Sequence, residues 1–284
     1  MKLEIVKREQ AKIKIGLQGA SGSGKSYSAL LLAYGMLQDW SKIAVIDTEN
    51  KSASLYSHLG RFYLIDFKPP YSPERYLQAV NLCIQAGIEV VIIDNISMEW
   101  EFILEAHSQL SGNSYTNWAK FTPRHQMFIN AILQADIHII CTLRAKQDYV
   151  LTPNKDGKLV PEKVGMKAIQ RDGVDYELTL VFELDQKHNA VATKDRTGLF
   201  EGMPDFKISQ ETGRTIVEWC KQGEITVRDY ANLIKACDTL EELRNFYESV
   251  AMEVQTQFKD EFNLRQSQLK SFTQNYSQNG TTVN

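Results

Sequence analysis

The chain lacks the features that mark membrane, secreted and zinc-binding proteins. No stretch approaches the ~20 apolar residues that a membrane-spanning helix needs. The first residues, MKLEIVKREQAK, alternate in charge and have no apolar core of a signal peptide. The four cysteines are far apart and form neither a CxxC pair nor a Cys/His zinc pattern. We therefore expect a cytoplasmic protein whose thiols are reduced and mostly buried.

A surplus of positive charge is also missing. The net charge is −3, which excludes a uniformly basic coat, so any contact with nucleic acid has to be local. The composition, with 43% hydrophobic residues, is rich enough to bury a real core. The length of 284 residues suits one large domain, or one domain with an appendage.

Apolar strand-like runs alternate with helical segments through most of the chain. Strands separated by helices predict an α/β fold with a mainly parallel sheet that is covered on both faces. The runs are KIKIGLQG (Lys12–Gly19), KIAVIDTE (Lys42–Glu49), FYLIDF (Phe62–Phe67), EVVIID (Glu89–Asp94) and IHIICTL (Ile137–Leu143).

Two further β-like runs and a helical region complete the predicted organisation. YELTLVFELD and NAVATKD flank residues 186–188 and predict a β-hairpin at the edge of the sheet. After Gly223 the pattern becomes helical, and Thr239 and Glu242 fit a capping box. We therefore expect a core domain over 1–222, a helical C-terminal extension over 223–272 and a polar, disordered tail over 273–284.

The segment GASGSGKS is a complete G-x-x-x-x-G-K-[ST] motif between a predicted strand and a predicted helix. Its glycines let successive backbone N–H groups turn toward phosphate oxygens, and the helix N-terminus adds positive potential. Lys25 would reach the β- and γ-phosphates of ATP, and the Ser26 hydroxyl would ligate Mg²⁺. The predicted nucleotide-binding residues are Gly19, Ala20, Ser21, Gly22, Ser23, Gly24, Lys25, Ser26 and Tyr27.

A second buried strand ends in Asp94, whose carboxylate can hold Mg²⁺ through water. In many nucleotide-hydrolysing enzymes a glutamate that activates water comes next, but here the next residue is Asn95, which cannot take a proton. Asp47 and Glu49 lie at the end of the strand that follows the P-loop helix. Because the carboxyl ends of parallel strands meet where the ligand binds, Glu49 could face the γ-phosphate and orient water.

At this point the chain resembles the RecA-like recombinase ATPases, whose second strand ends in Asp-x-Glu before a short helix, as in DTENKSASLYSHLG. The resemblance implies a RecA-like P-loop NTPase core with a mainly parallel central sheet. The edge β-hairpin and the small helical C-terminal extension that the pattern predicts complete this α/β fold class, and the extension lies outside the resemblance. It also implies that Glu49 is the catalytic base. Glu99 and Glu101 are alternative bases in a predicted loop beyond the Asp94 strand.

IICTLRAK (Ile139–Lys146) resembles the sensing strand of this family, which ends in a polar residue close to the γ-phosphate. The family's usual glutamine is Thr142 in this chain. The resemblance therefore makes Thr142 a candidate sensor. Arg144 is a second candidate, as a contact to the γ-phosphate or to DNA, although it could equally be a surface charge.

The segment from Arg144 to Asp172 is long and punctuated by Gly and Pro, so we expect a mobile loop. It carries seven Lys/Arg against four Asp/Glu, which suits a phosphate backbone, and an aromatic residue could stack on a base. The alternative is a solvated charged loop. The predicted DNA-binding residues are Lys146, Tyr149, Lys155, Lys158, Lys163, Lys167 and Arg171. A second predicted loop, about 100–118, could add Tyr115, Trp118 and Lys120, or its aromatics could be core.

ATKDRTG contains Lys194 and Arg196, which would point to the same face of a strand because one residue separates them. Some RecA-like proteins insert a similarly placed cationic pair into the ATP site of the neighbouring subunit. The resemblance therefore implies a catalytic role in trans for both residues. The alternative is a local ion pair with Asp195 or Asp185.

RAK, VPEKVG, QRDGVDYE and KDRTG, in that order, resemble the phage-encoded RecA-like ATPases of single-strand annealing and recombination, the Sak group. The resemblance covers about residues 12–222. It implies a DNA-stimulated ATPase that uses ATP and Mg²⁺, binds single-stranded DNA, forms a filament or ring, has a single-strand-binding protein as a further partner and needs no membrane. Two alternatives remain: a small-molecule or nucleoside kinase, and a nucleotide switch such as a helicase-loading partner.

Overall fold

The structure is a computed structural model that describes residues 12–153, 159–221, 227–250 and 252–278. The chain divides into two compact units, residues 1–222 and 223–284, which are described separately. In the first unit an eight-stranded sheet has the order β3-β2-β4-β5-β1-β7-β8, and β6 pairs with β5 outside this path. The strands are β1 (Lys14–Gly19), β2 (Ile43–Asp47), β3 (Tyr63–Asp66), β4 (Val90–Asp94), β5 (His138–Pro153), β6 (Leu159–Ala168), β7 (Leu180–Leu184) and β8 (Ala190–Asp195).

The strands from β3 to β7 in this order run parallel, and β8 pairs antiparallel with β7 at the edge. The mainly parallel α/β sheet and its edge hairpin are therefore confirmed. Because all the parallel strands point the same way, the residues that follow β1, β2, β4 and β5 lie along one edge of the sheet. The predicted nucleotide site lies at this edge.

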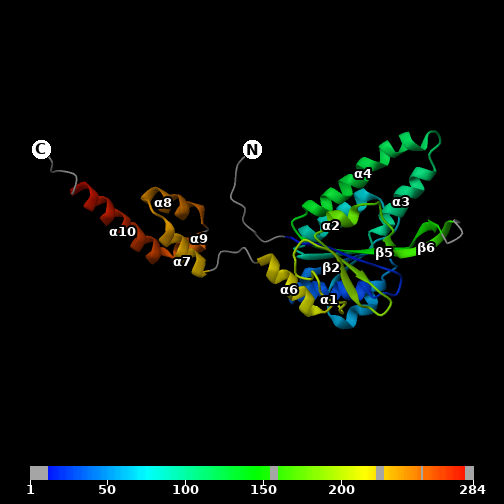
Figure 1. Cartoon of the computed structure of the whole chain (residues 1–284), viewed down its shortest axis with the longest axis horizontal. Helices are drawn as coiled ribbons and strands as arrows, with labels where there is room; N and C mark the ends of the chain where they lie inside the picture. Colours follow the sequence, from blue (N-terminus) through cyan, green and yellow to red (C-terminus); the bar gives the residue numbers. More distant parts are fainter. Residues whose placement is uncertain (1–11, 154–158, 222–226, 251, 279–284) are drawn as a thin grey trace. The chain divides into compact units, whose positions relative to one another are not determined.

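Helices cover both faces of the sheet, with α1 and α6 on one face and α2, α3 and α4 on the other (Figure 1). Successive strand residues point to opposite faces, so Val45 packs in the core under α1 while Ile46 packs in the core under α2 and α4. The helices of this unit are α1 (Lys25–Leu37), α2 (Pro73–Gln85), α3 (Ser97–Ser108), α4 (Ser114–Gln134), α5 (Val174–Glu177) and α6 (Gln210–Lys221), with 3₁₀ helices η1 (Trp40–Lys42) and η2 (Ser52–Leu59).

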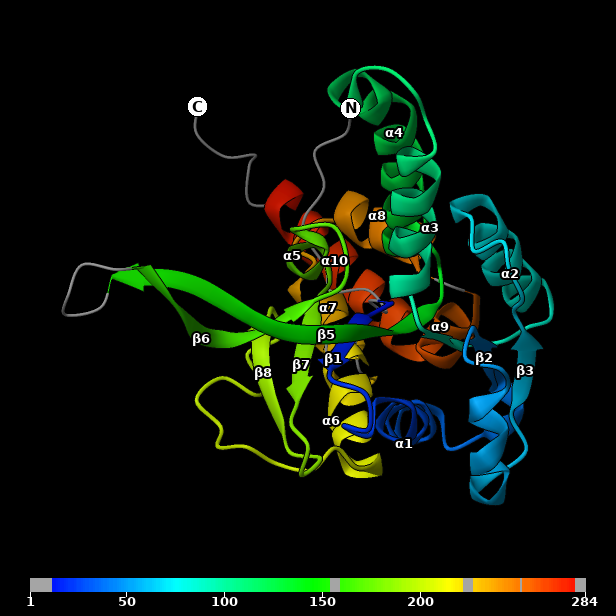
Figure 2. The same cartoon turned by 90° about the vertical axis from the view of Figure 1, so that its right-hand side faces the viewer.

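The segment 144–172, which we expected to be a mobile loop, is instead mostly a β-hairpin. β5 continues to Pro153, and β6 returns antiparallel to it, with Ala145 opposite Ala168 at the base. We call residues 145–153 and 159–168 the arm; it projects beyond the sheet (Figure 2). The runs DYVLT and KLV flank turn-type residues, a hairpin signal that the glycines and prolines obscured.

The region 100–118 also differs from the expected loop, because α3 and α4 occupy most of it. The Asn113 side chain accepts a hydrogen bond from the backbone N–H of Tyr115 (2.9 Å) and caps α4, so this helix begins at Ser114, before the end of the expected loop. Glu99 and Glu101, which we expected in a loop, lie on α3. Tyr115, Trp118 and Lys120 lie on α4.

The second unit is a group of helices around its own small apolar core. The side chains that form this core are Ile234, Leu243, Phe258, Phe262 and Leu269. The helices are α7 (Val227–Ala236), α8 (Leu240–Ser249), α9 (Met252–Gln257) and α10 (Lys259–Gln278). The capping box of Thr239 and Glu242 is present at the start of α8.

The predicted disorder of residues 273–284 is wrong for the part that the structure describes. Helix α10 continues to Gln278, and residues 279–284 lie outside the described residues. The reason is that no glycine or proline interrupts the segment before Gly280. Within the described ranges of both units, no helix has the length and apolar character to cross a membrane.

A buried hydrogen-bonded pair of side chains joins α3 to α4. Glu99 is 0% exposed, and one of its carboxylate oxygens lies 3.1 Å from Nδ1 of His125. Burial raises the pKa of Glu99, and the hydrogen bond from His125 opposes this shift. The ring of Trp100 packs edge-on against His125, with centroids 5.3 Å apart.

We expect His125→Ala to lower the free energy of unfolding by about 3–5 kcal/mol, because it leaves a buried carboxyl group without its partner. Urea denaturation measures the change, with Gln126→Ala, an exposed neighbour on the same helix, as the control. The double variant Glu99→Leu/His125→Leu should recover most of the loss, since no unpaired polar group remains. A single variant as stable as the control would contradict a structural role for the pair.

Candidate functional site

The P-loop connects the end of β1 to the start of α1. Gly22 and Gly24 have positive φ angles, 82° and 86°, which suit glycine and let the loop turn its backbone inward. The ammonium group of Lys25 donates hydrogen bonds to the carbonyl oxygens of Gly19 (2.9 Å) and Ala20 (2.8 Å). Burial lowers the pKa of Lys25, and the nearby carboxylates of Asp94 and Glu49 oppose this shift.

Asp94 lies at the end of β4 and is 2% exposed. Its two carboxylate oxygens accept hydrogen bonds from the hydroxyl groups of Ser26 (2.5 Å) and Thr142 (2.5 Å). Burial raises the pKa of Asp94, and both hydroxyl groups oppose this shift. The site therefore joins the first turn of α1, the end of β4 and the middle of β5.

Ser26 and Asp94, the predicted Mg²⁺ ligands, are thus in direct contact. A hydroxyl and a single carboxylate fit Mg²⁺, which is commonly held by one or two protein oxygens together with substrate phosphates and water. No group of three or more His, Cys, Asp or Glu side chains in the described ranges could hold a metal ion by itself. The arrangement therefore fits Mg²⁺ bound together with a nucleotide.

Glu49 lies beyond the end of β2, and its side chain is 34% exposed. One carboxylate oxygen accepts a hydrogen bond from the side-chain amide of Asn95 (2.7 Å) and further bonds from the Arg144 guanidinium (2.9 and 3.1 Å). The amide that replaces the expected glutamate therefore holds a carboxylate supplied by the neighbouring strand.

The other acidic residues near this edge are placed less well to activate water. Asp47 is fully buried, and its oxygens accept hydrogen bonds from the backbone N–H groups of Glu49 (2.6 Å) and Ala53 (2.8 Å). Glu99 is buried against His125. Glu101 lies 3.9 Å from the Arg144 guanidinium. The geometry therefore favours Glu49 among these carboxylates.

The two predicted sensor residues lie on β5 and contact different carboxylates. Thr142 bonds Asp94, whereas Arg144 bonds Glu49, and its backbone N–H also donates to Ser97 Oγ (3.0 Å). The same strand continues into the arm. Thr142 and Arg144 thus connect both carboxylates to the strand that continues into the arm.

Two residues that the sequence did not single out, Tyr56 and Gln186, lie beside the P-loop and the predicted Tyr27. The rings of Tyr27 and Tyr56 lie 5.6 Å apart, beside the start of α1. The turn between β7 and β8 contributes Gln186, whose side chain donates to the carbonyl oxygen of Ser21 (3.2 Å). The β7–β8 turn lies at the ligand edge because β7 pairs with β1. The predicted edge hairpin was the one sequence signal that could have suggested Gln186.

Lys194 and Arg196 point to the same side of the edge hairpin, as predicted, because both donate hydrogen bonds to the carbonyl oxygen of Tyr176. Lys194 is opposite Val181, which pairs with Gly16, three residues before the end of β1. The pair therefore lies away from the P-loop of its own chain.

Asp185 and Asp195, the alternative ion-pair partners of Lys194 and Arg196, bond backbone groups instead. Asp185 accepts hydrogen bonds from the backbone N–H groups of Lys187 and Asn189 (both 2.8 Å). Asp195 accepts from the backbone N–H groups of Thr197 (2.7 Å) and Phe200 (2.8 Å). Both aspartates therefore stabilise turns.

Two of the predicted DNA-binding lysines are direct cross-strand neighbours in the arm. Lys146 and Lys167 are opposite each other in the register of β5 and β6, and both are exposed. Lys167 also pairs with Asp172 (2.9 Å). Like charges placed directly opposite destabilise a hairpin unless an anion lies between them.

The remaining members of that set are only partly described. Lys155 and Lys158 lie outside the described residues, and the side chains of Tyr149 and Lys163 are likewise outside them. Arg171 follows the arm and lines a cavity beside α3 and α4.

The phosphate-binding loop follows β1 and the buried Asp94 ends β4, and β5 lies between these two parallel strands, an arrangement found in P-loop ATPases. The model of the AAA domain family AAA_24 matches residues 11–208, and the chain belongs to this family. A crystal structure of the KaiC-like protein PH0186 from the hyperthermophilic archaeon Pyrococcus horikoshii OT3 is 14% identical, with a TM-score of 0.38; the match covers 70% of this chain and 88% of that one. No curated protein matches the chain.

We expect Glu49→Gln to lower ATP turnover by at least ~10², the usual scale for losing a general base, while ATP binding is retained. Steady-state phosphate release and nucleotide titration measure the two quantities. Glu101→Gln is the matched control, because Glu101 also lies near Arg144 and is exposed to a similar extent. An active Glu49→Gln protein together with an inactive control would show that the base had been misassigned.

Proposed function

We propose that the chain is an ATP-dependent ATPase that binds single-stranded DNA, assembles with copies of itself and promotes DNA annealing or recombination. The observation that carries this proposal is the continuity of β5. One strand holds Thr142 and Arg144 against the carboxylates of the site and then presents Lys146 opposite Lys167. A nucleotide site and a phosphate-binding surface are thus parts of one element.

The residues of the site have distinct tasks in hydrolysis. The P-loop N–H groups and Lys25 hold the β- and γ-phosphates, for which Lys25 exchanges its bonds to the loop carbonyls. Ser26 and Asp94 would hold Mg²⁺, which would supply positive charge beside the transferring phosphoryl group. Glu49, oriented by Asn95, positions the attacking water and accepts its proton.

The base of the nucleotide lies against the tyrosine pair beside the P-loop. Tyr27 is 38% exposed and directly follows Ser26, and Tyr56 is half-buried beside it. Aromatic rings stack on the flat face of a purine at little conformational cost. This pair therefore gives the adenine ring a surface within reach of the phosphate site.

DNA binding rests on charge placed locally in a chain that is acidic overall. The facing lysines of the arm suit successive phosphates of a single strand. Because the arm grows out of the strand that contacts Glu49, the bound strand changes the hydrolytic site through Arg144. This linkage supports turnover that depends on DNA rather than on a small acceptor.

We expect single-stranded DNA to raise the ATPase rate, and the rate per subunit to increase with protein concentration because assembly is required. Lys146→Ala/Lys167→Ala should weaken DNA binding and flatten the slope of log affinity against log salt by about 1.4, or ~0.7 for each phosphate that is no longer neutralised. Phosphate release and fluorescence anisotropy measure these effects.

The matched control for that experiment is Lys42→Ala/Arg61→Ala. It removes the same charge near the amino ends of β2 and β3, far from the proposed surface. Stimulation by a small acceptor instead of DNA would indicate a kinase. Nucleotide binding without turnover, with or without DNA, would indicate a switch.

The position of Lys194 and Arg196, away from their own P-loop, supports action at the site of a neighbouring subunit. A cation supplied in trans can stabilise the transferring phosphoryl group by a factor of about 10³–10⁵ in rate. We therefore expect Lys194→Ala/Arg196→Ala to be inactive by itself. A mixture with Glu49→Gln, which is also inactive, should regain part of the activity, because some interfaces then combine intact cations with an intact base.

The recovery should increase with total protein concentration. Co-assembly of the two variants has to be checked, and differently labelled proteins allow this by energy transfer. If co-assembled variants stay as inactive as each component, the cations act within their own chain or only stabilise the turn at Tyr176.

A further inference from the structure

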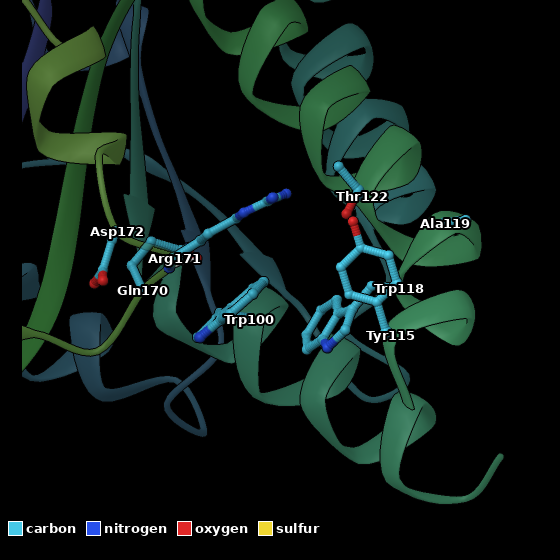
Figure 3. Close-up of a pocket in the computed structure, with 8 residues that line it drawn as sticks. All are labelled: Trp100, Tyr115, Trp118, Ala119, Thr122, Gln170, Arg171 and Asp172. Carbon is cyan, nitrogen blue, oxygen red and sulfur yellow. Dashed lines mark hydrogen bonds between the residues drawn. The ribbon is translucent and has the colours of Figure 1, made fainter. Parts of the chain in front are cut away.

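A cavity of ≈ 760 Å³ lies between α3, α4 and the residues that follow the arm. It is separate from the P-loop and lies within the range of about 300–1,000 Å³ that small-molecule sites occupy. The residues that line it are Trp100, Tyr115, Trp118, Ala119, Thr122, Gln170, Arg171 and Asp172 (Figure 3).

The wall formed by α3 and α4 is aromatic and ordered before any ligand binds. Trp100 and Trp118 are stacked with centroids 5.7 Å apart and planes 20° apart, and His107 stacks on Trp118 at 4.1 Å. The edge contact of Trp100 with His125 fixes it further. Tyr115 adds a ring that is 86% exposed at the rim. A large exposed ring beside two stacked indoles is a surface suited to a flat partner.

The opposite wall brings one cation to this aromatic surface. Gln170 is anchored, because its amide donates to the carbonyl oxygen of Ile96 (3.1 Å) while its oxygen accepts from the backbone N–H of Arg171 (2.8 Å). Figure 3 shows the Arg171 side chain extending toward α4, whereas Asp172 points away from the rings. Asp172 is instead paired with Lys167. A guanidinium that faces aromatic rings across a cavity suits a base stacked on the rings with its phosphate near the cation.

The cavity shares lining residues with the surface proposed for DNA. Gln170, Arg171 and Asp172 also line a second cavity of ≈ 300 Å³, which Lys167 of the arm lines as well. A strand whose phosphates lie along Lys146 and Lys167 therefore passes the opening beside Arg171. Gln170 bonds Ile96, and the residue before Ile96 is Asn95, which holds Glu49. This wall of the cavity is therefore anchored one residue away from a contact of the hydrolytic site.

We propose that this cavity binds a nucleobase of single-stranded DNA, stacked on the wall of Trp100, Tyr115 and Trp118, with its phosphate near Arg171. The proposal rests on the proposed function, because it names the contact by which the same DNA is held. Phosphate contacts by the arm tolerate any backbone, whereas this contact requires a base. The two contributions can therefore be separated with a strand that has no bases.

Binding is measured with oligo-dT and with an abasic strand of equal length, by anisotropy. The reporter protein carries Trp40→Phe/Trp219→Phe, so that only Trp100 and Trp118 of the four tryptophans remain. We expect oligo-dT to quench this fluorescence and to bind about 5–150-fold more tightly than the abasic strand, the range for stacking one base. Tyr115→Ala and Trp100→Leu should weaken oligo-dT binding and leave abasic binding unchanged.

The controls separate this site from the arm and from protein stability. Tyr115 is on the surface, so Tyr115→Ala keeps the test valid if Trp100→Leu does not fold. Tyr63→Ala, which removes a ring that is 60% exposed on β3, should bind both strands as the parent does. Lys146→Ala/Lys167→Ala should weaken both strands by the same factor.

Three results would overturn the proposal. If variants of the aromatic wall still prefer oligo-dT over the abasic strand as strongly as the parent does, the base binds elsewhere. The proposed function would remain intact in that case if the ATPase activity still depends on DNA. If free thymidine monophosphate quenches the tryptophan fluorescence at the same concentration as the oligonucleotide does, the cavity binds a mononucleotide rather than a strand. A parent protein that binds neither strand would remove both this inference and the proposed function.

Discussion

The carboxylate of Asp94 holds the site together, because the rest of the site is built around its two hydrogen bonds. Burying this group costs free energy, and the hydroxyl groups of Ser26 and Thr142 offset part of that cost. One hydroxyl comes from the first turn of α1 and the other from β5. A single acidic side chain therefore links the P-loop helix to β4 and β5 beyond the pairing of the strands, and the same group would hold Mg²⁺.

The carboxylate proposed to activate water is positioned by a separate set of contacts. Glu49 is held by Asn95 and by Arg144, so the residue after Asp94 orients the base without being one. The base thus comes from β2 and its supports come from β4 and β5. Since these three strands are neighbours in the order β2-β4-β5, their carboxyl ends bring the groups together without any long loop.

Local patterns predicted the parallel strands, the P-loop and the edge hairpin, because each depends on residues that are near in sequence. The arm, α3 and the first turn of α4 were missed, since Gly and Pro obscured the strand alternation of DYVLT and the Asn113 cap was not recognised, whereas the rest of α4 was expected as a helix over about 118–135. The bond from Asn95 to Glu49 spans 46 residues, and the bonds from Arg144 to Glu49 span 95. These contacts depend on the register of the sheet, which local sequence patterns do not reveal. The same is true of the position of Lys194, away from the P-loop of its own chain.

The length of β5 gives the arm a mechanical property. From Arg144 to Pro153 the strand covers about 30 Å at ~3.3 Å per residue, and its pairing with β6 stiffens it. In a rigid hairpin of this length, a rotation of about 10° at the Arg144–Glu49 contact moves Pro153 by about 5 Å. Displacements too small to separate the groups around Glu49 therefore become displacements of several ångströms at the far end of β5.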